Sequence, residues 1–131
     1  MSGTGASVLY GGLSVALGAA IYWASSLPRV SMPGGSEGGF GLASNLFHLP
    51  LYATLSFFLS MSLAGGRPQD LTLRLGAAAL ILAAAYAALD EWHQSFVPGR
   101  TAAVSDFLLD VAGIGGMLLL LHLESRAEVN R

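Results

Sequence analysis

The feature that most constrains this chain is a set of long apolar runs with very little charge. A helix needs roughly 20 apolar residues to cross about 30 Å of hydrocarbon. Four runs approach that length: Val8 to Ala24, Leu46 to Leu63, Leu71 to Trp92 and Ser105 to Leu123. They are continuous in Ala, Leu and Gly rather than alternating, which favours helices over barrel strands. The sequence predicts an all-α fold, an integral membrane bundle of four transmembrane helices.

The composition agrees with this class. Hydrophobic residues make up 53% and charged residues 11% of the 131 residues, whereas soluble domains carry roughly 25% charged residues. The net charge is −2 and all six basic residues are Arg, so no basic surface for nucleic acid is expected. Cysteine is absent, which excludes disulfides and thiolate metal sites. A chain of this length is expected to form one domain, residues 1–131.

The loop arginines predict how the bundle is oriented. An even number of spans puts both termini on one side of the membrane, together with Arg67, Arg74, Arg126 and Arg131. Arg29 and Arg100 lie on the opposite side. The positive-inside rule then favours cytoplasmic N- and C-termini for a multi-pass protein of the bacterial cell membrane. The Gly-rich segment 25–44 would lie outside and is expected to lack regular structure.

Polar residues recur at helical spacing near the outer ends of three predicted helices. Residues three or four apart share one helix face. The three sets are Asn45, His48, Tyr52 and Ser56; Tyr86, Asp90 and either His93 or Gln94; and Asp106, Asp110 and Gly113. We expect the three polar faces to meet at one membrane surface.

Three acidic residues in this group, Asp90, Glu91 and Asp110, are expected to need compensating partners. Asp90 and Glu91 end a predicted helix, where the macrodipole disfavours each negative charge by roughly 0.3 to 1 kcal/mol. Asp110 lies a turn inside its helix, and an acid at a helix centre costs roughly 2.5 kcal/mol in lipid. Such a carboxylate indicates a functional site, and an interhelical hydrogen bond to Tyr52 or Asn45 is the structural alternative.

A turn at Pro98-Gly99 is predicted to fold Arg100 back toward these acids. Arg100 could then form a structural ion pair with Asp90, Glu91 or Asp106. Its planar guanidinium could instead bind an anionic substrate. The sequence leaves both roles open.

Taken together, these motifs resemble the VanZ-like family of bacterial membrane proteins, named for a protein associated with resistance to the glycopeptide antibiotic teicoplanin. The residues that carry the resemblance are His48, Tyr52, Asp90-Glu91, Gln94, Pro98-Gly99-Arg100, Ser105-Asp106, Gly113 and Gly116. It extends from Ser26-Leu27-Pro28 to Gly116. Two departures are Asp110, where members often have Asn, and Ser44-Asn45, where a charged residue is common. The resemblance implies a cell-envelope setting and supplies no reaction.

Our first hypothesis is a site that binds or processes an anionic lipid or a lipid-linked cell-wall intermediate. Arg100 and Arg29 would hold its phosphate or carboxylate, and the other predicted ligand-binding residues are Asn45, Tyr52 and Gln94. His48 and His93 would be hydrogen-bond or proton-transfer partners, oriented by the acids. The predicted catalytic set is therefore His48, His93, Asp90, Glu91, Asp106 and Asp110.

Two alternatives belong to other classes of protein. Asp90 and His93, three residues apart, are similar to the carboxylate-x-x-His pairs that helix bundles use for metals, and His48 could complete such a site. The full pattern of four carboxylates and two such pairs is missing, so neither a metal nor a cofactor is predicted. The other alternative is a non-catalytic membrane scaffold whose polar residues stabilise the bundle.

Overall fold

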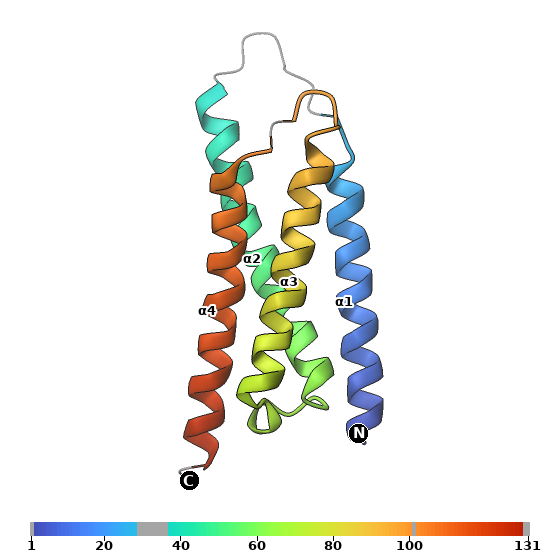
Figure 1. Cartoon of the computed structure of the whole chain (residues 1–131), viewed down its shortest axis with the longest axis vertical. Coiled ribbons are helices and arrows are strands. Elements are labelled where there is room, and N and C mark those ends of the chain that lie inside the picture. Colours follow the sequence, from blue (N-terminus) through green and yellow to red (C-terminus); the bar gives the residue numbers. More distant parts are fainter. Residues whose placement is uncertain (1, 29–36, 101, 130–131) are drawn as a thin grey trace.

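The computed structural model describes the backbone of residues 2–28, 37–100 and 102–129, and the side chains of residues 2–28, 47–100 and 102–127. Four helices make up most of it: α1 (Gly3–Ser25), α2 (Glu37–Leu63), α3 (Leu73–Gln94) and α4 (Val104–Val129), with a short 3-10 helix η1 (Pro68–Asp70). They form an elongated bundle in which α1 begins and α4 ends at the same end (Figure 1). No strand occurs within these described ranges. The all-α, four-helix prediction is confirmed.

The helices have the length and surface of a membrane protein. α1, α3 and residues 104–127 of α4 are long and apolar enough to cross a membrane. α2 contributes a shorter apolar segment, Phe47–Leu63, and its 27 residues extend about 40 Å. Large apolar side chains, such as Val8, Ile81 and Leu119, are exposed on the outside of the bundle. An extensive apolar surface of this kind marks contact with lipid rather than water.

Local sequence signals explain where several helices begin and end. Ser2 and Thr72 are N-caps, and their side chains accept from main-chain N–H groups three residues later, at 3.2 and 3.3 Å. After α2, Gly65 and Gly66 have positive φ angles of 63° and 79°. The Gly66 N–H donates to the Met61 carbonyl at 2.8 Å, which closes the helix end.

The connection from α3 to α4 contains the predicted turn. The Arg100 N–H donates to the Val97 carbonyl at 3.1 Å, and Gly99 has a φ of 76°. A glycine with positive φ after proline is typical of a type II turn. This turn places Arg100 beside the end of α1, as its side-chain contacts below show.

The start of α2 differs from the prediction. Residues 37–44 were expected to be irregular because the segment is rich in glycine, but α2 already begins at Glu37. Each glycine costs a helix about 1 kcal/mol relative to alanine. Extending an existing helix adds one backbone hydrogen bond per residue without a new nucleation cost. This gain outweighs the glycine penalty in residues 37–44.

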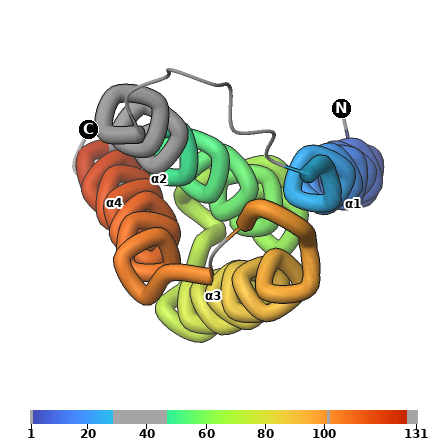
Figure 2. Tube along the Cα trace, turned by 90° about the horizontal axis from the view of Figure 1, so that it is seen from above, coloured from blue at the N-terminus to red at the C-terminus, as the bar shows by residue number. Residues whose placement is uncertain are grey.

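The core brings α2 into contact with all three other helices, most extensively with α4. Seen along the bundle, α2 runs between α4 and α1, and α3 closes the other side (Figure 2). The buried cluster consists of Ile21, Tyr52, Leu55, Ala83, Ala87 and Ile114. Gly113 of α4 packs so closely on α2 that a Cβ there would overlap the Leu49 carbonyl oxygen. This close approach puts the polar faces of α2 and α4 in direct contact.

Candidate functional site

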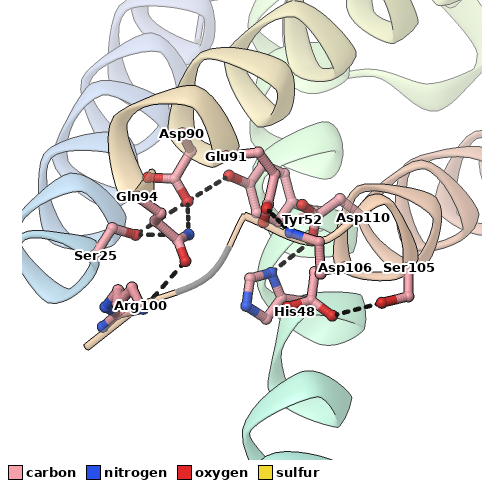
Figure 3. A network of polar contacts seen from close by, with 11 residues as sticks. Ser25, His48, Tyr52, Asp90, Glu91, Gln94, Arg100, Ser105, Asp106 and Asp110 are labelled. Atoms are coloured by element: carbon pink, nitrogen blue, oxygen red, sulfur yellow. Dashed lines mark hydrogen bonds and ion pairs between the residues drawn. The ribbon is translucent and has the colours of Figure 1, made fainter. Parts of the chain in front are cut away.

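Buried polar side chains gather where α1 and α3 end and α4 begins, at the end of the bundle opposite the termini (Figure 3). The buried members are Ser25, Asp90, Glu91, Gln94, Asp106 and Asp110, and the half-buried His48 joins them from α2. The structure therefore brings the polar faces of α2, α3 and α4 together, as the helical spacing predicted. α1 also contributes, which was not predicted.

One part of the site is centred on Asp90. Its Oδ2 accepts from Ser25 Oγ of α1 at 3.0 Å, from Tyr52 Oη of α2 at 3.3 Å and from Gln94 Nε2 at 2.9 Å. Three helices thus supply donors to a single carboxylate oxygen. These three bonds connect the ends of α1 and α3 to the middle of α2.

Arg100 belongs to the same part of the site through Gln94. Its Nη1 donates to Gln94 Oε1 at 3.3 Å, while Nε and Nη2 donate to the carbonyl oxygens of Leu27 at 3.1 Å and Ala24 at 2.6 Å. Among the described residues, Arg100 reaches Asp90 through Gln94 rather than by a direct ion pair. A cation at the carbonyl end of a helix also complements the helix dipole.

The second part of the site joins α2 to α4. His48 Nδ1 lies 3.0 Å from Asp110 Oδ1, and the Asp110 side chain is fully buried. Glu91 of α3 lies beside this pair, and its Oε2 accepts from the main-chain N–H of Ala103 at 3.0 Å. Asp106 is also buried, and its Oδ1 accepts from Ser105 Oγ at 3.3 Å.

Each of three carboxylates in the site keeps one buried oxygen that has no hydrogen-bond partner in the described part of the chain. These atoms are Asp90 Oδ1, Glu91 Oε1 and Asp110 Oδ2. A buried acceptor without a partner costs about 1 to 3 kcal/mol, and more when it is charged. The site therefore has unused capacity to bind protons, a cation or a donor group of a ligand.

Two pockets border these residues. One, of about 290 Å³, lies between α1 and α2, and its wall combines Ser25, His48, Tyr52, Asp90 and Arg100 with the apolar Ile21, Ala24, Phe47 and Leu51. The other, of about 330 Å³, lies between α3 and α4. Glu91 lines this second pocket together with Trp92, Ala103 and Phe107. The residues of the second part of the site thus have access from two sides.

The other predicted site residues lie apart from this group or outside the description. His93 stacks on Tyr22 with ring centroids 4.5 Å apart, and its Nε2 lies 3.0 Å from Ser26 Oγ. It therefore faces α1, away from the His48 pair. Arg29 and the side chain of Asn45 lie outside the described residues.

Sequence reasoning missed Ser25 and Ser26, which contact Asp90 and His93. Serines near the end of an apolar helix are common, so their types alone gave no signal. Their position was informative, because both residues lie at the end of the first span, on the same side of the membrane as the predicted polar faces. His48, Glu91 and Asp110 were all in the predicted catalytic set, but their grouping as possible metal ligands was not predicted, since the metal alternative had paired Asp90 with His93.

The family model described as VanZ/LLP1 matches residues 12–123 of the chain. Comparison with curated proteins and with solved structures gives no match. The matched region includes every residue of both parts of the site and most of all four helices.

Proposed function

The chain belongs to the VanZ/LLP1 family, and from that premise we propose that it binds the polar end of an anionic envelope lipid or lipid-linked cell-wall intermediate. The observation that carries this proposal is the mixed lining of the pocket between α1 and α2. Ligand pockets are mostly apolar with a few convergent polar groups. A pocket of this kind near the end of a membrane helix suits an amphiphile with a charged head.

The two ends of such a ligand would meet different walls of the pocket. Arg100 supplies the positive charge for a phosphate or carboxylate. Ser25 and Tyr52 donate their protons to Asp90, so their oxygens are left to accept from a hydroxyl or amide of the head group. Phe47 and Leu51 are exposed on the outside of α2, beside lipid chains, and continue the apolar wall. His48, held by Asp110, has the histidine–carboxylate arrangement of a general acid or base, so the site could also process its ligand.

We test ligand binding by native mass spectrometry of the detergent-purified chain, searching for retained anionic lipid. Wild type should retain lipid, and Leu51→Trp, which fills the pocket, should lose most of it. Leu82→Trp is the matched control, because Leu82 is exposed on α3 and does not line the pocket. Equal lipid retention in all three proteins would overturn the proposal.

A non-catalytic scaffold is the second candidate, and one observation favours it. Arg100 and Asp90 connect the ends of α1 and α3 to each other and to the middle of α2 through bonds within the chain. Polar residues that connect helices in lipid stabilise a bundle without any ligand. The stability of the Arg100 variants, described below, separates this role from ligand binding.

We also propose that the polar end faces the outside of the cell, on the basis of the arginine distribution. The absence of native cysteine allows a direct test by single substitutions at exposed positions. Ser95→Cys, at the polar end, should react with an impermeant maleimide on intact cells, and Gln69→Cys, in η1 at the other end, should not. The reverse labelling would move the site to the cytoplasmic face.

A further inference from the structure

We propose that His48, Glu91 and Asp110 form a binding site for one divalent transition-metal ion, such as Zn²⁺ or Mn²⁺. The three residues come from three helices, α2, α3 and α4. One ligand atom from each lies within 4.8 Å of the other two. Figure 3 shows the His48 ring and the Glu91 and Asp110 carboxylates close together between these helices.

The spacing of the His48 and Asp110 atoms suits coordination. His48 Nδ1 and Asp110 Oδ1 are 3.0 Å apart. Two ligands that each lie about 2.1 Å from one ion are about 3.0 Å apart in octahedral coordination and about 3.4 Å apart in tetrahedral coordination. The His48 and Asp110 side chains would therefore need to move little for both to bind one metal ion.

A second observation points to a ligand, namely the unpartnered oxygens. Glu91 Oε1 and Asp110 Oδ2 have no hydrogen-bond partner in the described part of the chain, although Glu91 is only 8% exposed and Asp110 is 0% exposed. Two carboxylates this close repel each other when both are ionised. A divalent cation between them would neutralise both charges and satisfy both oxygens.

The donor set indicates the class of ion. One imidazole nitrogen and two carboxylate oxygens suit borderline transition metals better than Mg²⁺ or Ca²⁺, which prefer oxygen ligands only. Three protein ligands leave a position for water or for an oxygen of a bound molecule. Because Glu91 and His48 each line a different pocket, an ion can be reached from either side. The metal site does not depend on lipid binding.

The test uses the full chain without a histidine tag, stripped with a chelator and titrated with Zn²⁺ and, separately, Mn²⁺ by calorimetry. Wild type should bind one equivalent of at least one of these ions and melt at a higher temperature with it. Asp110→Asn and Glu91→Gln should each weaken binding by about 100-fold or more, since even outer-shell changes at metal sites cost 10- to 100-fold. His122→Ala and Glu124→Gln, both exposed near the far end of α4, are matched controls and should bind as wild type does.

Wild type alone can overturn the metal site, even if a variant fails to fold. Failure to bind a stoichiometric amount of either ion, with an unchanged melting temperature, would mean that protons neutralise the two carboxylates. Stoichiometric binding that survives Asp110→Asn in a folded protein would also overturn it. Lipid retention without metal binding would remove only the metal site, and metal binding without lipid retention would remove only the proposed function.

Discussion

Asp90 and Asp110 are both buried aspartates at the polar end of the bundle, but they differ in the number of hydrogen-bond donors around the carboxylate. Asp90 receives three donors on one oxygen, from α1, α2 and its own helix. Asp110 has one hydrogen-bond partner among the described residues, His48, and Glu91 beside it has one main-chain donor. All three carboxylates keep one oxygen without a partner in the described part of the chain, so the difference lies in the number of donors on the other oxygen. A buried carboxylate surrounded by donors holds a fold together, whereas an under-supplied one has capacity left for chemistry. The comparison predicts that Asp90 contributes mainly to stability, and it supports the metal site proposed at Asp110.

The largest effect should come from removing the carboxylate of Asp90. Asp90→Ala leaves the Ser25, Tyr52 and Gln94 donors without their shared acceptor. We expect a loss of about 3 kcal/mol in the free energy of unfolding, because buried donors that lose their acceptor cost about 1 to 3 kcal/mol each and part of this is recovered by rearrangement. Denaturation in detergent measures it. Asp90→Asn, which keeps an acceptor oxygen, is the control and should lose less; equal losses would deny the importance of these bonds.

The second prediction concerns the close contact that brings His48 to Asp110. Gly113→Ala places a methyl group against the Leu49 carbonyl and forces α4 away from α2. We expect a loss of about 2 kcal/mol, which is typical of overpacking. Gly115→Ala, two residues on, meets nothing within 4 Å and should be neutral or slightly stabilising because alanine favours helix. Thermal melts of both variants test this close packing of α4 on α2, and equal melting temperatures would contradict it.

Arg100→Gln should have a smaller effect. It removes the charged donor from the Ala24 and Leu27 carbonyls at the end of α1. Because these bonds are near the surface, we expect a loss of about 1 kcal/mol. Arg100→Lys should restore part of it, since an ammonium cannot reproduce the planar multiple contact. If Arg100→Gln melts as wild type does but loses its lipid, Arg100 acts mainly in ligand binding rather than in stabilising the bundle.

The smallest change in stability is expected for Asp110→Asn. The substitution removes a fully buried charge and preserves a polar group beside His48. In chelator-treated protein the free energy of unfolding should stay within about 1 kcal/mol of wild type or rise, because the amide oxygen of Asn can still accept from His48 and the imidazole can stay neutral beside it. If Asp110→Asn instead costs as much as Asp90→Ala in the same denaturation assay, the contrast between the two aspartates is wrong.

The sequence was sufficient for the helices and for the end of the bundle that holds the polar residues. Membrane thickness dictates the length of the apolar runs, and helical periodicity places Asp106, Asp110 and Gly113 on one face. The bonding partners were not predictable. Arg100 donates to main-chain carbonyls of α1, and every residue has such a carbonyl, so none is marked in the sequence. His93 was grouped with Asp90 by spacing, but its partners lie on α1.

The hydrogen bonds between α1 and the other helices also determine how many substitutions α1 can tolerate. Tyr86 Oη donates to the Gly18 carbonyl at 2.6 Å, Ser62 Oγ donates to the Ser7 carbonyl at 3.0 Å, and Arg100 Nη2 donates to the Ala24 carbonyl at 2.6 Å. In all of these bonds α1 offers only its main chain, which no substitution other than a helix-breaking one removes. Outside Ser25 and the few positions that pack inward, α1 can therefore exchange one apolar residue for another without losing its place in the bundle. Most of the hydrogen bonds that position α1 therefore depend on residues of the other helices, while Ser25 and the ring of Tyr22 are contacts made by its own side chains.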